Sequence, residues 1–130
     1  MGTLQQLPTV LVVDDHEVTV ELLARLIRAE GYTVHTAMGC RDGLRVALQY
    51  GCDLLVIDLC LPDGDGCDLL RAVRAHLPVP AVAVTGSQDP ALAAKAARAG
   101  FERVLSKPLV YADLSTAIRR LWDGPPAASR

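Results

Sequence analysis

Two features of this 130-residue chain predict an α/β fold with a central parallel sheet. Short runs of β-branched and aliphatic residues recur along the sequence, and stretches with helical spacing of apolar residues separate them. Strands that are apolar on both faces need helices on both sides, and right-handed crossovers join strands that run parallel. We therefore expect five βα units that form one doubly wound domain.

The expected strands are short apolar or β-branched runs at residues 10–13, 33–36, 54–57, 81–84 and 104–105. Units this short leave no room for a second half of the sheet. The flavodoxin-like strand order 2-1-3-4-5 is therefore favoured over a complete dinucleotide-binding fold. The absence of a Walker A loop and of a complete GxGxxG motif also disfavours nucleotide binding.

The first three helices are expected between these strands. The first spans residues 17–30 and stops at Gly31. Its predicted apolar stripe contains Val18, Leu22, Leu23, Leu26 and Ile27. The second and third are indicated by Leu44, Ala47 and Leu48 before Gly51, and by Leu69, Leu70 and Val73 before Pro78.

The fourth helix has the clearest boundaries. Asp89 is its expected N-cap, Pro90 its first residue, and Gly100 follows an alanine-rich body. The fifth helix is expected at residues 112–122, with an inward face of Leu114, Ile118 and Leu121. We expect one domain at residues 9–122, with an N-terminal extension at residues 1–8 and a flexible tail at residues 123–130.

Composition excludes several classes of protein. Hydrophobic residues make up 51% of the chain and charged residues 22%, as in soluble globular proteins. A net charge of −2 and scattered arginines give no electrostatic footprint for nucleic acid, so we expect none to be bound directly. The longest apolar runs are far shorter than the roughly 20 residues of a membrane-spanning helix, and no secretory signal is recognisable. We therefore expect a cytoplasmic protein that does not contact a membrane.

The cysteines indicate neither a zinc site nor a redox motif. Cys40, Cys52, Cys60 and Cys67 form no CxxC pair and have no histidine at a spacing typical of zinc sites. We expect reduced thiols that are buried or half-buried.

The ends of the expected strands carry the candidate functional residues, because open parallel sheets bind ligands outside the carboxyl ends of their strands. Asp14 and Asp15 end the first strand, Asp58 the third and Thr85 the fourth, and the fifth ends in Ser106 and Lys107. We therefore expect three carboxylates, a hydroxyl group and an ammonium group at one edge of the sheet.

Three ionised carboxylates at such short range would repel one another strongly unless a cation lay among them. Mg²⁺ suits this need, because it takes one or two carboxylates and a carbonyl and keeps waters that phosphate oxygens can replace. Asp58 could then act as a carboxylate nucleophile toward phosphorus and form an aspartyl phosphate. Thr85 and Lys107 could help to position and neutralise the phosphoryl group.

Four segments resemble the receiver domain of two-component response regulators. They are VLVVDD at residues 10–15, DLCLPDGDG at residues 58–66, AVTG at residues 83–86 and LSKP at residues 105–108. Each segment is weak evidence alone, but all four occur in the expected order at the expected strand ends. The resemblance covers nearly the whole chain.

The resemblance implies a role for each residue of the pocket. Asp58 would be the phosphoacceptor, and Thr85 and Lys107 would contact the phosphoryl oxygens. Mg²⁺ would be bound directly by Asp15 and Asp58, by Asp14 through water and by the backbone carbonyl of Cys60. Pro62 and Gly66 match the loop after the phosphoacceptor and would shape it.

The resemblance also implies a regulatory module rather than a metabolic enzyme. A histidine kinase or a histidine phosphotransfer protein would donate the phosphoryl group, which slow hydrolysis would remove. A downstream protein would bind the face formed by the fourth helix, the fifth strand and the fifth helix. The chain could be a stand-alone regulator or the receiver at the end of a hybrid histidine kinase, and residues 100–109 favour the second.

Two positions depart from the family pattern. Val104 stands where members often have a Tyr or Phe that swings inward, which puts the usual aromatic switch in question. Gly86 stands where Ala is common and gives a more flexible loop beside the phosphoryl site.

Other interpretations stay open at this point. Asp15 could simply cap the first helix. Asp63, Asp65 and Asp68 superficially resemble a calcium loop, but Asp68 stands where that loop needs Gly, so a solvated acidic turn is favoured. A phosphate-independent docking module is the main alternative function. A Mg²⁺-dependent hydrolase with an Asp nucleophile is less favoured, because Cys60 would be a poor general acid.

Overall fold

The computed structural model describes residues 7–123 of the chain. Residues 1–6 and 124–130, which hold most of the expected N-terminal extension and C-terminal tail, lie outside the described residues. Asp123 was expected in the tail but is the last residue of the fifth helix.

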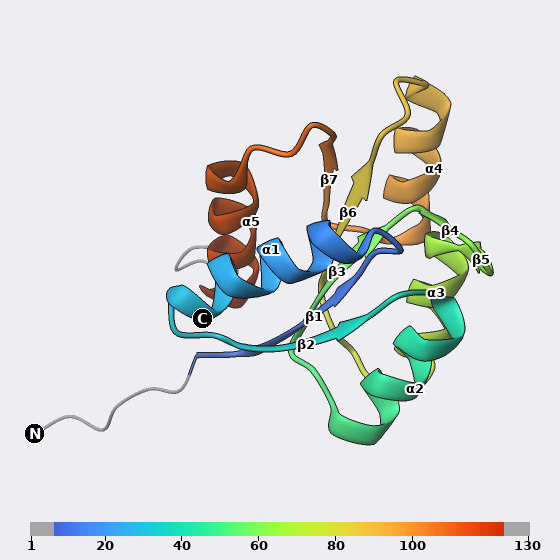
Figure 1. The fold of residues 1–130 in the computed structure, drawn as a ribbon. Coiled ribbons are helices and arrows are strands. Elements are labelled where there is room, and N and C mark those ends of the chain that lie inside the picture. Colours follow the sequence, from blue (N-terminus) through green and yellow to red (C-terminus); the bar gives the residue numbers. More distant parts are fainter. Residues whose placement is uncertain (1–6, 124–130) are drawn as a thin grey trace, which may run out of the picture.

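Five parallel strands form the central sheet (Figure 1). They are β1 (Thr9–Val13), β2 (Thr33–Ala37), β3 (Leu54–Asp58), β6 (Ala81–Thr85) and β7 (Arg103–Ser106). Their order in the sheet is β2-β1-β3-β6-β7, which confirms the predicted order 2-1-3-4-5.

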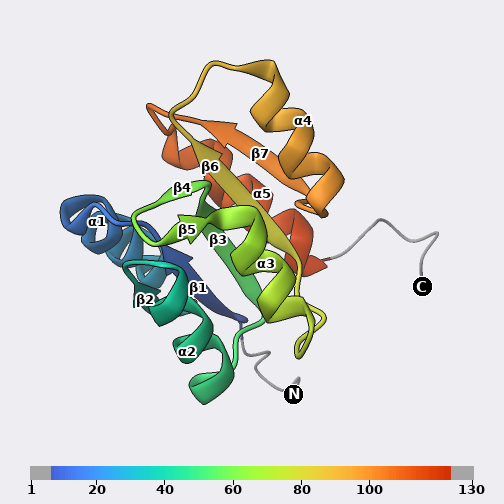
Figure 2. The same cartoon turned by 90° about the vertical axis from the view of Figure 1, so that its right-hand side faces the viewer.

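Helices cover both faces of the sheet (Figures 1 and 2). They are α1 (Glu17–Ala29), α2 (Cys40–Tyr50), α3 (Gly66–Arg74), α4 (Pro90–Ala99) and α5 (Tyr111–Asp123). Helices α1 and α5 pack on one face, and α2, α3 and α4 on the other. The described helices include none that is long and apolar enough to span a membrane.

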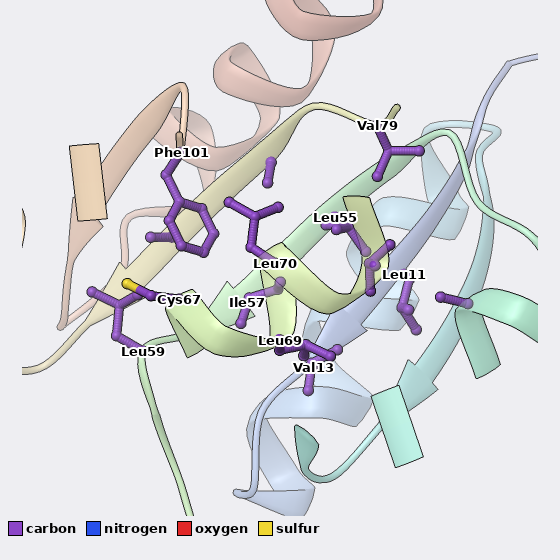
Figure 3. Packing of buried hydrophobic residues seen from close by; sticks show 14 of the residues in the cluster. Leu11, Val13, Leu55, Ile57, Leu59, Cys67, Leu69, Leu70, Val79 and Phe101 are labelled. Atoms are coloured by element: carbon purple, nitrogen blue, oxygen red, sulfur yellow. The ribbon is translucent and has the colours of Figure 1, made fainter. Parts of the chain in front are cut away.

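The strands divide their side chains between two hydrophobic clusters, because successive residues of a strand point to opposite faces. Leu11, Leu55 and Ala83 join the cluster under α2, α3 and α4, whereas Val12 and Val56 join the cluster under α1 and α5. Figure 3 shows the first cluster packed around α3. Burial on both faces explains why the central strands read as continuous apolar runs.

The predicted apolar stripe of α1 is wrong at two positions. Val18 is 68% exposed and Leu22 is 54% exposed. The buried face instead contains Val20, Leu23, Ala24 and Ile27. These four residues follow the i, i+3, i+4, i+7 spacing of a single helical face, and with about 3.6 residues per turn Val18 and Leu22 lie on nearly the opposite side of the helix.

The helix ends follow local capping chemistry. The Asp89 side chain accepts a hydrogen bond of 2.9 Å from the Ala91 N–H, and Gly100 ends α4 in the left-handed region, so both predictions are confirmed. Helix α1 is capped by His16, whose Nδ1 accepts from the Thr19 N–H at 3.3 Å, and not by Asp15. Asp15 therefore has no capping role.

Candidate functional site

The sheet order brings the predicted pocket residues together. Asp14 follows β1, Asp58 ends β3, Thr85 ends β6 and Lys107 follows β7, and these four strands are neighbours in the sheet. Asp14, Asp58 and Thr85 are the polar residues buried within the described part of the chain, each at most 6% exposed. Asp15 lies at the exposed rim beside them.

The three carboxylates lie close enough to share a cation. One oxygen each of Asp14, Asp15 and Asp58 lies within 4.8 Å of the others. The Lys107 ammonium lies 3.2 Å from Asp14 Oδ2 and 3.0 Å from Asp58 Oδ2. Carboxylate oxygens are the ligands that Mg²⁺ prefers, so the donor set fits such an ion.

The charge of Lys107 is secured by its two partners. Burial lowers the pKa of the ammonium, but the hydrogen bonds and negative charges of Asp58 and Asp14 outweigh burial and raise the pKa above its ordinary value. Because the pKa is higher in the folded state, this stabilisation is fully present at neutral pH and is lost only when the pH rises through the raised pKa. The pocket therefore contains a permanent cation.

The same polar groups also hold local turns. Asp14 Oδ1 accepts from the His16 N–H at 2.9 Å, and Asp58 Oδ1 accepts from the Cys60 N–H at 3.0 Å. Thr85 Oγ1 accepts from the Ser87 N–H at 3.0 Å. The same side chains therefore hold the turns and form the pocket, because each carboxylate has lone pairs left for a second partner.

The loop after Asp58 forms a small hairpin that was not predicted from the sequence. Strands β4 (Cys60–Leu61) and β5 (Gly64–Asp65) pair antiparallel. Asp63 accepts from the backbone N–H groups of Cys40 and Arg41 at 2.6 and 3.0 Å. Its carboxylate therefore caps α2, whose own N-cap residue is Gly39.

The acidic turn therefore has specific structural roles. Asp65 caps α3 by accepting from the Cys67 N–H at 2.8 Å. Asp68 lies in the first turn of the same helix and pairs with Arg71 at 2.8 Å. Gly39, the N-cap residue of α2, has no side chain that could accept a hydrogen bond from the first turn. This glycine was the feature of the sequence that could have indicated a cap from another segment.

Gly66 lies where no side chain fits. A Cβ atom there would lie 2.6 Å from the Asp58 carbonyl oxygen and 2.9 Å from Ile57 Cγ2. The first turn of α3 thus packs directly against the end of β3, which confirms that this glycine lets the chain enter the helix.

The cysteines are all free among the described residues. Cys67 is buried, and Cys40 and Cys52 are half-buried, which agrees with expectation. Burial raises the pKa of the Cys40 and Cys52 thiols to about 11, so both are protonated at neutral pH. The exposed thiol of Cys60 contradicts the prediction, because the residue lies on the two-residue strand β4 at the rim of the pocket.

The fold and the site together define a doubly wound α/β domain with an acidic pocket and a lysine at the carboxyl edge of its sheet. The sequence pattern of the response regulator receiver domain matches residues 10–119. The chain belongs to this family of regulatory domains.

Two curated relatives illustrate the match. The KDP operon transcriptional regulatory protein KdpE of Escherichia coli is 31% identical over 110 residues, which cover 85% of this chain and 49% of that protein. The transcriptional regulatory protein PrrA of Mycobacterium tuberculosis is 34% identical over 117 residues, covering 88% of this chain and 49% of that protein. The chain spans about half the length of these relatives.

Solved structures agree with the fold. A CheY-like receiver domain protein from Methanospirillum hungatei superposes with a TM-score of 0.85 at 27% identity, covering 90% of this chain and 94% of that one. A receiver domain from Clostridium thermocellum gives a TM-score of 0.83 at 29% identity, covering 90% and 95%.

The close approach at Gly66 generates a prediction about stability. Gly66→Ala should lower the free energy of unfolding by about 1–3 kcal/mol, because the added methyl group has to push the end of β3 away. Gly86→Ala is the matched control, since its Cβ would meet only Lys107 Cδ at 3.9 Å. Urea unfolding of the three proteins measures the difference. Equal stability of the two variants would contradict the geometry.

Proposed function

We propose that this domain is a phosphorylation-controlled signalling module in which Asp58 accepts a phosphoryl group. The observation that carries the proposal is the buried Asp58 carboxylate, whose Oδ2 lies 3.0 Å from the Lys107 ammonium within a group of three acidic residues. A buried carboxylate among charges of both signs is typical of a reactive site.

The reaction transfers a phosphoryl group between two side chains. An Asp58 oxygen attacks phosphorus, an O–P bond forms, and the P–N bond of a donor phosphohistidine breaks, so that the imidazole leaves with the electron pair. The Lys107 ammonium and the Thr85 hydroxyl group stabilise the phosphoryl oxygens. The donor is a histidine kinase or a histidine phosphotransfer protein.

A divalent cation completes the proposed site. Asp15 and Asp58 would bind Mg²⁺ directly, Asp14 through water and Cys60 through its backbone carbonyl. When bound, Mg²⁺ supplies positive charge that offsets the repulsion between the carboxylates and the phosphoryl oxygens. Slow hydrolysis of the acyl phosphate would return the domain to its resting state, in the cytoplasm.

The output is a change of protein contacts. Turning toward a phosphoryl group would draw the Thr85 hydroxyl away from the Ser87 N–H and alter the loop that leads into α4. The face formed by α4, β7 and α5 is therefore proposed to bind the downstream partner. The lack of nucleic-acid binding by this chain and its place in a hybrid kinase both remain predictions.

Labelling with acetyl phosphate tests the phosphoacceptor. In the presence of Mg²⁺ the wild-type protein should gain the mass of one phosphoryl group, in an adduct that is stable in acid and labile in base. Asp58→Asn should gain none, because an amide is not a nucleophile toward phosphorus. Intact-mass spectrometry measures both. A folded wild-type protein that never forms the adduct would favour the phosphate-independent docking module instead.

The donor is proposed to bind the exposed apolar part of α1. Val18 and Leu22 border a cavity of about 290 Å³ that also reaches Asp14, Lys107 and Leu109. Any protein that brings a phosphohistidine to Asp58 must cover this rim, since Asp14 and Lys107 belong to both the cavity and the acidic pocket. Exposed apolar side chains beside a reactive site are typical of a contact surface.

Substitution on this surface should separate protein donors from small ones. With a histidine kinase that phosphorylates the wild type, Leu22→Glu should slow phosphotransfer by about tenfold or more, because a buried contact becomes an unpaired charge. Labelling by acetyl phosphate should not change. Leu48→Glu on α2, where the side chain is 47% exposed, is the matched control. Equal transfer rates for the two variants would place the donor elsewhere.

A further inference from the structure

One ion pair joins the loop of the phosphoacceptor to helix α4. The Lys95 ammonium lies 2.5 Å from Asp65 Oδ2, and the other Asp65 oxygen caps α3 through the Cys67 N–H. The Lys95 side chain is 53% exposed and that of Asp65 is 28% exposed. An exposed pair of this kind contributes little to stability, so its removal should leave the fold intact.

The pair is the last step in a short series of contacts that begins at Asp58. Asp58 Oδ1 accepts from the Cys60 N–H at 3.0 Å, and Cys60 pairs with Asp65 across the β4–β5 hairpin. Asp65 then binds Lys95 on α4. One hydrogen bond, the pairing of the two hairpin strands and one ion pair therefore connect the Asp58 carboxylate with α4.

Helix α4 packs on the molecule through few apolar side chains. Ala96 is its only fully buried residue in the described structure, and Leu92 and Ala99 are partly buried against the same hydrophobic cluster. The C-terminal end is fixed by Arg74, which donates from Nη1 to the Gly100 carbonyl at 2.7 Å and pairs with Glu102. Lys95 provides the contact that links the middle of the helix to the pocket side of the molecule.

We propose that the Asp65–Lys95 ion pair transmits the state of Asp58 to helix α4. The proposal rests on the function proposed above and adds the route by which phosphorylation reaches the output face. Val104 occupies the strand position at which family members often have an aromatic switch residue. The ion pair would couple Asp58 to α4 without such a residue.

The physical cause is a change in the carboxylate that the hairpin binds. In the free pocket the Cys60 N–H donates to a charged oxygen, which makes a strong hydrogen bond. An acyl phosphate carries its charge on the phosphoryl oxygens instead, so the acceptor left for Cys60 is a weaker, neutral one. The hairpin can then shift and move the Asp65 carboxylate, and α4 follows through Lys95.

Hydrogen–deuterium exchange with the phosphoryl mimic beryllium fluoride and Mg²⁺ tests the coupling. In the wild type the mimic should change exchange in the hairpin and in residues 90–99. In Lys95→Ala the hairpin should still respond, but the response of residues 90–99 should fall to half or less. Lys95→Arg should restore it. Asp65→Asn should act like Lys95→Ala, because asparagine keeps the α3 cap but loses the charge.

Arg98→Ala is the matched control, because Arg98 is another exposed cation of α4 that pairs with no described acidic residue. An α4 response in Lys95→Ala as large as in Arg98→Ala, with an intact hairpin response, would overturn the coupling and leave Asp58 as the phosphoacceptor. A hairpin that does not respond in the wild type, together with no acetyl phosphate adduct, would overturn both proposals.

Discussion

The attraction between the Lys107 ammonium and the carboxylates of Asp14 and Asp58 is the interaction on which the rest of the site depends. Two buried carboxylates side by side repel each other, and removing one partner from a buried pair leaves an uncompensated charge. The parallel sheet resolves this conflict, because it places the ends of β1 and β3 next to each other and lets Lys107 reach both from beyond β7. Together with Asp15 at the rim, the pocket has three carboxylates and one ammonium group, so a further cation could offset the remaining negative charge.

The polar side chains at this edge of the sheet both line the pocket and hold the loops in place. Asp14, Asp58 and Thr85 each accept a backbone hydrogen bond from a residue two positions later, and this bond fixes the turn that presents the side chain. Asp63 and Asp65 extend the arrangement to the caps of α2 and α3. A change of charge at the pocket would therefore act on groups that also hold the surrounding loops and helices in place.

The sheet, the helices and the pocket were predictable because they depend on local patterns. Apolar runs located the strands, and Asp89 and Gly100 bounded α4. The exposure of Val18 and Leu22 was not predictable in the same way, since α1 has more apolar residues than one buried face can hold. The β4–β5 hairpin and the Asp65–Lys95 pair depend on contacts between segments far apart in the sequence, and one chain alone carries no signal for such contacts.

A crystal structure of the protein with Mg²⁺ and beryllium fluoride would test directly the proposal that Asp58 accepts a phosphoryl group beside a bound Mg²⁺. We expect beryllium bonded to an Asp58 oxygen, fluorine atoms within hydrogen-bond distance of Lys107 Nζ and Thr85 Oγ1, and Mg²⁺ between the Asp15 and Asp58 carboxylates. An intact fold with the Lys107 contacts of this structure, and with neither ion in the pocket at saturating concentrations, would contradict this proposal.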